Sequence, residues 1–223
     1  MVPSNAKIVK CPYCGTEKEL MCLASGNTFG AEFWSDNKRI APMLPQISPV
    51  QKCQRCGKYY QEYLLKSREG NDCSFEKGEL SYQEWKEAYG QFSEEKIPES
   101  NLNNVRFWLI QAYNDHYHRN NNEKTSMRHG RQNNGPIPTP TQEEYDFISG
   151  IIKEFIEIYD WSKVEKPSLL KADLYRQANE MQKCKETLSD IAAQQMEEFE
   201  MIIYNDIKER MEKGDNKVFK LNI

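Results

Sequence analysis

Two short stretches decide how the N-terminal part of the chain folds: KCPYCG at Lys10–Gly15 and KCQRCG at Lys52–Gly57. In each stretch a tight turn directs two thiolates to one side of the backbone, and the final glycine relieves crowding where backbone N–H groups approach sulfur. Four thiolates around one ion select Zn²⁺ or iron, and the closed shell leaves no position for a substrate. We therefore predict one structural zinc ion, with redox-active iron as the alternative. The predicted ligands are Cys11, Cys14, Cys53 and Cys56.

The remaining cysteines and the N-terminus indicate the cellular setting. Cys22, Cys73 and Cys184 have no framework spacing, which favours metal binding over disulfides. The N-terminus lacks the long apolar core of a secretory signal, and no stretch approaches the roughly 18 apolar residues of a membrane span. We therefore expect a cytoplasmic protein without membrane association.

The composition is that of a folded chain with a polar surface. Hydrophobic residues make up 38% of the chain and charged residues 29%. The hydrophobic share is well above that of chains that are too polar to fold. The net charge of -4 provides no global basic field to attract nucleic acid or anionic lipid. Any contact with a nucleic acid would have to be local.

The first part of the chain, residues 1–78, has the pattern of a small β domain. Aromatic and β-favouring stretches follow each cysteine pair, at Lys18–Leu23 and Gly57–Leu65. The segment between the pairs is longer than the roughly 15–20 residues of a compact double-pair zinc site. We therefore assign an insertion at about residues 23–50.

The insertion contains an apolar segment, FWSDNKRIAPMLP, at Phe33–Pro45. Asp36 and Asn37 tolerate the left-handed backbone of a tight turn and predict a hairpin there. The large apolar side chains of the segment either pack against the β domain or the first helices, or they form a surface for a partner. The residues assigned to the partner surface are Phe33, Trp34, Met43 and Leu44.

Residues 79–223 follow the period of helices. Ser81 with Glu84, and Thr141 with Glu144, form capping boxes that predict helix starts. The fold class is therefore α+β, with a small N-terminal β domain followed by an all-α domain. Between two of the helices, residues 119–141 form a polar and locally basic loop. This loop is either a solvated connection or a contact for a phosphate backbone through Arg119, Lys124, Arg128 and Arg131.

No set of catalytic residues is recognisable in the sequence. It contains no phosphate-binding, dinucleotide-binding or nucleophile-elbow motif. Asp115, His116 and His118 suggest an acid–base or metal cluster, but helix positions two apart point to different faces. We therefore expect these residues to be solvated or to pack at a helix end, and we expect a protein that is not an enzyme.

Two parts of the chain resemble known families. CPYCG and CQRCGKYY resemble the knuckles of zinc-ribbon (rubredoxin-like) domains, which bind zinc for structure or, in rubredoxin, iron for electron transfer. The segment Leu169–Ile191 resembles one tetratricopeptide unit, a helix pair that commonly presents a concave surface to peptides or proteins. The positions that carry this second likeness are Ala172, Tyr175, Cys184 and Leu188.

Together the two parts resemble uncharacterised bacterial proteins that join a zinc ribbon to a tetratricopeptide-like helical domain. The resemblance implies a zinc-binding adaptor or scaffold that contacts another protein or peptide through its helical domain. Two alternatives stay open from the sequence. They are a nucleic-acid-binding zinc-ribbon protein and a rubredoxin-like iron electron carrier.

Overall fold

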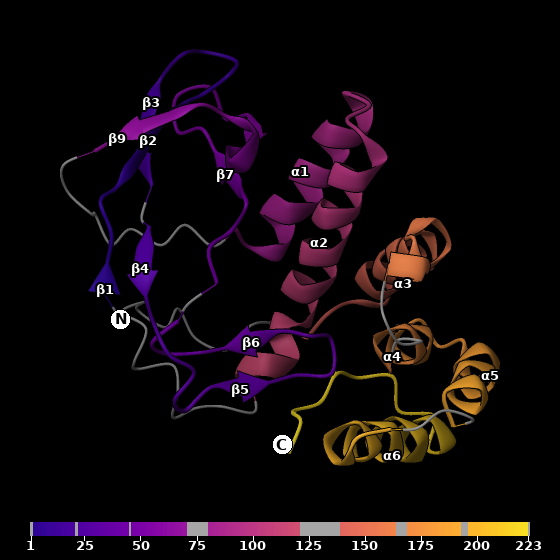
Figure 1. Ribbon diagram of the computed structural model, residues 1–223. Coiled ribbons are helices and arrows are strands. Elements are labelled where there is room, and N and C mark those ends of the chain that lie inside the picture. Colours follow the sequence, from indigo (N-terminus) through magenta and orange to yellow (C-terminus); the bar gives the residue numbers. More distant parts are fainter. Residues whose placement is uncertain are drawn as a thin grey trace. The chain divides into compact units, whose positions relative to one another are not determined.

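In the computed structural model the chain forms two compact units, and Figure 1 shows their strands and helices. The ribbon unit contains Met1–Ala31 and Ile40–Ile97, and the helical unit contains Glu32–Arg39 and Pro98–Ile223. A hairpin from the predicted insertion therefore belongs to the helical unit, and the first long helix belongs to the ribbon unit. That residues 1–78 and 79–223 are separate domains stays a prediction. The described residues are 2–20, 22–44, 46–70, 80–120, 139–163, 169–192 and 196–222.

The described strands of the ribbon unit form small antiparallel sheets, as the β prediction required (Figure 1). Each knuckle is the turn of a two-stranded hairpin, because β2 leads through Cys11–Cys14 to β3, and β7 leads through Cys53–Cys56 to β8. The sheets are β3 (Glu17–Leu20) with β2 (Lys7–Lys10) and β9 (Ser67–Glu69), β1 (Val2–Pro3) with β4 (Leu23–Ser25), and β7 (Val50–Lys52) with β8 (Tyr59–Gln61). A short 3-10 turn, Glu62–Leu64, follows β8.

The ribbon unit ends in helix α1, Tyr82–Glu94. The predicted capping box is confirmed, because Ser81 accepts a hydrogen bond from the Glu84 backbone and the Glu84 carboxylate accepts one from the Ser81 backbone. The apolar stripe of this helix buries Trp85, Ala88 and Phe92.

The helical unit continues the chain from Pro98. In this unit α2 contacts α3, α3 contacts α4, and α4, α5 and α6 contact one another. The second predicted capping box, at Thr141 and Glu144, is also confirmed. The helices are α2 (Glu99–Asn120), α3 (Gln142–Ile158), α4 (Leu169–Gln177), α5 (Met181–Ala192) and α6 (Glu198–Glu212), with a 3-10 turn at Trp161–Lys163.

The core of α4, α5 and α6 contains three of the positions that carry the tetratricopeptide likeness. Ala172, Cys184 and Leu188 are buried there, and Tyr175 packs against them. The buried Arg176 donates hydrogen bonds to the carbonyls of Asp215 and Lys217, which fixes the C-terminal segment to α4. These contacts show a packed helix pair, and its identity as a tetratricopeptide unit stays a prediction.

The hairpin consists of β5 (Glu32–Phe33) and β6 (Arg39–Ile40), and all of it except Ile40 belongs to the helical unit. Asn37 at its turn has φ 60°, as the predicted left-handed turn requires. The Ser35 N–H donates to the Phe219 carbonyl at 2.9 Å, so the C-terminal segment lies along β5. Beside it, Trp34 is 0% exposed. The hairpin is therefore part of the core of the helical unit rather than a surface loop.

Candidate metal centre

The four predicted ligands meet at one point of the ribbon unit. The Sγ atoms of Cys11, Cys14, Cys53 and Cys56 all lie within 4.8 Å of one another. Those of Cys11 and Cys56 are 3.7 Å apart, and those of Cys14 and Cys53 are 3.5 Å apart. A tetrahedral ion with Zn–S bonds of about 2.3 Å places its sulfurs about 3.8 Å apart, whereas a disulfide requires about 2.05 Å. The spacing therefore fits a single tetrahedral metal ion.

Backbone hydrogen bonds and glycines build the two knuckles in the same way. Gly15 donates its N–H to the Cys11 carbonyl at 2.9 Å, and Gly57 donates to the Cys53 carbonyl at 2.8 Å. Both glycines adopt left-handed backbone conformations, with φ of 72° and 73°. Any other residue would be strained at these positions, which explains the glycine after each second cysteine.

Local donors favour the thiolate form for two of the four sulfurs, whereas burial and the neighbouring thiols raise the pKa of Cys56 to about 12. Hydrogen bonds from Thr16, whose hydroxyl lies 3.2 Å from Cys14 Sγ, lower the pKa of Cys14 to about 6. The backbone N–H groups of Cys56 and Arg55 lower the pKa of Cys53. A bound divalent cation would offset the repulsion among four thiolates. The chemistry of the donor set is therefore also that of a metal site.

The apolar cluster around the sulfurs is too small to stabilise the ribbon unit by itself. Cys11 and Cys53 belong to the apolar cluster of the ribbon strands, together with Val9, Leu20 and Tyr60. Cores of this size usually require a metal or disulfides. A closed four-sulfur shell has no open position for a substrate, so the geometry supports a structural role. The sulfur positions suit zinc and iron equally.

The predicted partner-binding residues fall into two groups. Met43 is 39% exposed and Leu44 is half-buried, and both belong to the ribbon unit. Phe33 is 37% exposed, whereas Trp34 is completely buried, and both belong to the helical unit. In this structure Trp34 packs in the core, and the partner-binding role of the other three residues stays a prediction.

The predicted nucleic-acid contacts lie almost entirely outside the described residues. Lys124, Arg128 and Arg131 are not among them. Arg119 is in the last turn of α2, and the described part of the structure does not include its side chain. The role of the loop stays a prediction.

A buried ionic cluster in the helical unit was only partly anticipated. His118 is 1% exposed, and its ring lies between two carboxylates, with Nδ1 3.0 Å from Asp115 Oδ1 and Nε2 3.2 Å from Asp36 Oδ2. Lys38 Nζ lies 2.5 Å from Asp115 Oδ1, and Asn114 donates to Asp36 at 3.0 Å. From the sequence we expect Asp115 and His118 to be solvated or to pack at a helix end, whereas the structure joins them in an ionic cluster. The sequence offered no signal for the partner Asp36, whose pattern predicted only a turn. Because Asp36 and Lys38 of the hairpin bond to His118, Asn114 and Asp115 of α2, the cluster holds the hairpin to this helix.

Burial and charge act in opposite directions on the pKa values of this cluster. For Asp36 and Asp115 burial raises the pKa, but His118 and Lys38 outweigh it and hold both values below the usual range. For His118 burial lowers the pKa, and the charges and hydrogen bonds of the two carboxylates outweigh it, so that the pKa is raised. Both carboxylates are therefore charged near neutral pH, and they favour the charged form of His118.

This cluster predicts how the stability of the helical unit depends on pH. The contribution of His118 is complete below its unfolded pKa of 6.5 and is lost as pH rises through its raised folded value. The contribution of the carboxylates is lost as pH falls below about 3.9. We expect hydrogen-exchange protection of residues 111–118 to be greatest between these limits. In His118→Gln the decline above pH 6.5 should disappear, and a decline of equal slope in this variant would contradict the assignment.

Comparison of the chain with protein-family models, with curated protein sequences and with solved structures gives no match. None of the helices in the described ranges is long and apolar enough to cross a membrane.

Proposed function

We propose that the chain is a zinc-binding, non-enzymatic adaptor that holds protein partners on apolar surfaces of its two units. The observation that carries this proposal is the exposure of large apolar side chains on both units. For the compartment we propose the cytoplasm, which the grouping of four cysteines as metal ligands supports.

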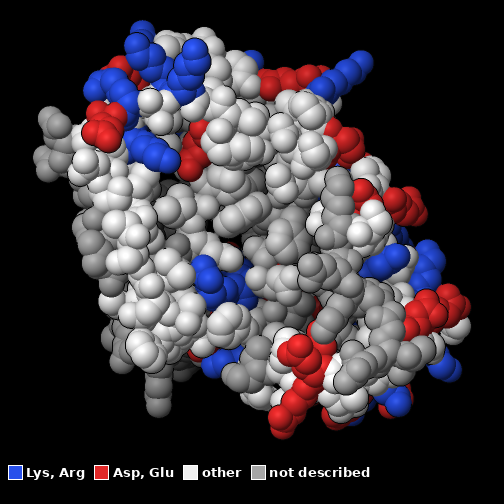
Figure 2. All heavy atoms as spheres, viewed as in Figure 1, with Lys and Arg blue, Asp and Glu red and all other residues white. Residues whose placement is uncertain are grey.

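The ribbon unit carries a surface without charge, formed by residues 22–31, 40–44 and 46–50 and called here the insertion surface. These residues include no Asp, Glu, Lys or Arg, although 29% of the chain is charged. Phe29 is 82% exposed and Ile47 is 38% exposed. The part of this surface over β1 and β4 is the white area at the left of Figure 2. Depletion of charge is typical of the centre of a protein interface.

An ordered turn presents Phe29 on this surface. Its N–H donates to Asn27 Oδ1 at 3.0 Å, and the Ala31 N–H donates to the Thr28 carbonyl at 2.9 Å. Gly30 completes the turn with φ 67°. Because the turn is already formed, little conformational entropy is lost when a partner covers the ring.

The helical unit offers a second surface at the start of α6. Phe199, Met201 and Ile202 are 47%, 42% and 37% exposed there. This surface supports the part of the proposal that assigns a protein contact to the helical domain. The resemblance of Leu169–Ile191 to a tetratricopeptide unit supports the same role. Two surfaces on two units are what an adaptor requires.

Zinc is the metal that we propose for the four cysteines. The supports are the closed ligand shell and the knuckle sequences, both typical of structural zinc sites. A rubredoxin-like iron carrier is the alternative that the same sulfur geometry permits.

One observation favours nucleic acid as a second candidate partner. Basic side chains are exposed around the knuckles and the adjoining strands, and Figure 2 shows them over β2, β3 and β9. On the same elements only Glu17 and Glu69 are exposed acids. A local positive surface of this kind suits a phosphate backbone. The exposed basic residues are Lys7, Lys10, Arg55, Lys58, Lys66 and Arg68.

The adaptor proposal predicts that replacing Phe29 with serine removes protein partners without changing the fold. Loss of a central aromatic contact of about 2 kcal/mol or more corresponds to roughly a 30-fold loss of affinity. The measurement is quantitative capture from cell extract, with the neighbouring Thr28→Ser as the control. Phe199→Ser is expected to remove a different set of proteins.

Two outcomes would contradict the proposal. One is an unchanged set of captured proteins in both Phe29→Ser and Phe199→Ser. The other is loss of the captured material from the wild-type protein after nuclease treatment, which would favour the nucleic-acid candidate. Circular dichroism of each variant checks that its helices are intact.

A further inference from the structure

Helix α1 of the ribbon unit turns a polar stripe toward the two metal knuckles. Glu87 and Gln91 of the helix and Glu95, which caps its C-terminus, are spaced by four residues and therefore share one side. A stripe of charged and amide side chains on a surface helix usually contacts only water. Here each of the three residues bonds to a residue in or beside a knuckle.

Gln91 forms the central contact of the stripe. Its Oε1 accepts the Tyr59 N–H at 3.0 Å, and its Nε2 donates to the Tyr59 carbonyl at 2.9 Å. The side-chain amide thus pairs with the backbone of β8 as another strand would. Its Nε2 also lies 3.0 Å from the hydroxyl of Tyr13, in the first knuckle. One residue of α1 therefore contacts both halves of the metal site.

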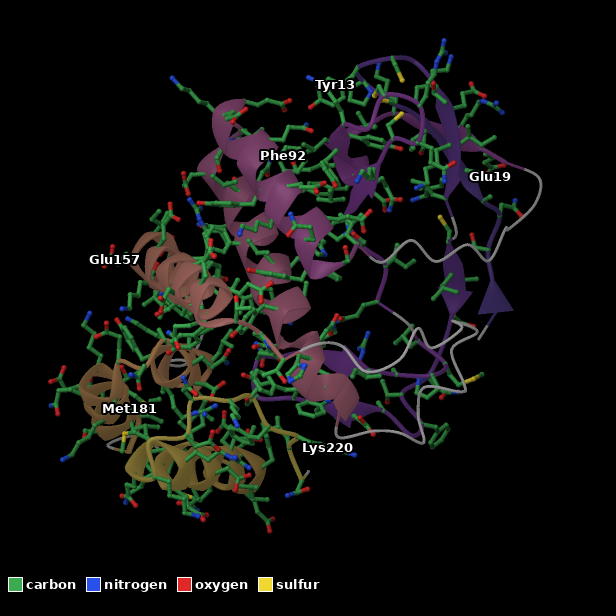
Figure 3. All side chains as sticks on the ribbon, turned by 180° about the vertical axis from the view of Figure 1, so that it is seen from behind. Tyr13, Glu19, Phe92, Glu157, Met181 and Lys220 are labelled. Atoms are coloured by element: carbon green, nitrogen blue, oxygen red, sulfur yellow. The ribbon has the colours of Figure 1, made fainter. Side chains whose placement is uncertain are left out.

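Glu95 contacts the first knuckle. The Tyr13 hydroxyl donates to its two carboxylate oxygens at 2.9 and 2.7 Å. Tyr13 lies between the ligands Cys11 and Cys14, and Lys58 from the second knuckle region lies over its ring at 4.6 Å. Figure 3 labels Tyr13 and the α1 residue Phe92.

Glu87 contacts the second knuckle. The Tyr59 hydroxyl donates to Glu87 Oε2 at 2.6 Å, and Lys52 Nζ lies 3.5 Å from the same oxygen. Lys52 immediately precedes the ligand Cys53. The three contacts, which we call the knuckle–helix contact, therefore depend on the relative position of two knuckles that lie far apart in the sequence.

We propose that α1 is a metal-dependent latch, docked on the knuckles through this contact when the four cysteines hold a metal ion and released when the ion leaves. The four sulfurs tie the knuckles to each other, so the ion preorganises the surface that α1 binds. By linkage, docking of α1 raises the affinity for the ion by the same factor. Helix α1 is the last element of the ribbon unit before the chain enters the helical unit at Pro98. The latch proposal does not depend on the adaptor proposal.

The first test measures the affinity of the full chain for Zn²⁺ by competition with a chromophoric chelator. Coupling between two sites typically changes affinity about 5- to 150-fold, and we expect Gln91→Ala to weaken zinc binding about tenfold. Glu95→Ala should weaken it less, because only one knuckle loses its contact. Glu94→Ala is the matched control, since Glu94 is exposed and forms no described contact with the knuckles. Equal affinities for wild type, Gln91→Ala and Glu95→Ala would overturn the proposal.

The second test follows hydrogen exchange in α1 of the wild-type chain before and after removal of the metal by a chelator. We expect Tyr82–Glu94 to lose protection by a factor of ten or more, because the packing of Trp85, Ala88 and Phe92 would then be left to hold a helix whose length is marginal in isolation. Peptides from α4 and α5 serve as the internal reference and should keep their protection. Full protection of α1 in the metal-free chain would overturn the proposal, whether or not the adaptor proposal is correct.

Discussion

Replacement of Cys53 with serine is expected to release the metal ion and unfold the ribbon strands, while the far-ultraviolet signal of α2 to α6 is largely retained. A serine hydroxyl is a poor substitute for a thiolate ligand of a soft tetrahedral site. Structural zinc contributes an apparent ~10–16 kcal/mol in small peptides at neutral pH, which is comparable to the whole stability of a domain. The small apolar cluster around Cys11 and Cys53 cannot replace a contribution of that size.

Elemental analysis of the purified chain tests this prediction together with the identity of the metal. We expect one zinc per wild-type chain, a colourless protein, and no metal in Cys53→Ser. Cys22→Ser is the matched control, because Cys22 is half-buried and lies outside the four-sulfur cluster. A visible absorption band with bound iron would favour the electron-carrier alternative. Retention of metal by Cys53→Ser would refute the ligand assignment.

Replacement of Trp34 with alanine is expected to destabilise the helical unit by about 3–5 kcal/mol, the usual cost of deleting a buried tryptophan side chain. Trp34 is 0% exposed, and its ring packs edge to face with that of His118 at a centroid distance of 4.6 Å. Its backbone also pairs with Lys38 and forms a bridge with Lys220. The substitution therefore removes a side chain from the point where hairpin, α2 and C-terminal segment meet.

Phe33→Ala is the control for this prediction, because the neighbouring ring is 37% exposed. We expect a loss of about 1 kcal/mol or less for it. Urea unfolding followed by circular dichroism measures both variants. Similar values for the two substitutions would show that Trp34 is not a core residue.

The parts of the fold that were predicted from the sequence depend on neighbouring residues. The two knuckles follow from cysteine and glycine spacing within six-residue stretches. The starts of α1 and α3 follow from capping boxes at Ser81 and Thr141. In each case the deciding contact joins residues that are close in the chain, so a short window of sequence contains it.

The parts that were not predicted depend on contacts between distant residues. Asp36 bonds to Asn114 across 78 positions, and Ser35 bonds to Phe219 across 184. Nothing in the sequence around Asp36 distinguishes a buried ion-pair partner from an exposed turn residue. Similarly, the pattern of Glu87, Gln91 and Glu95 matches that of an ordinary solvated helix face.

The assignment of Glu32–Arg39 to the helical unit has a consequence for how the gene of this protein can be divided. A cut between residues 78 and 79 separates Trp34 and Asp36 from α2, although it passes through no helix or strand of the described structure. The coding sequences of the two units are interleaved, so neither can be exchanged by a single recombination event. Because a fusion or truncation must carry both segments of a unit, we expect the two units to have been inherited together.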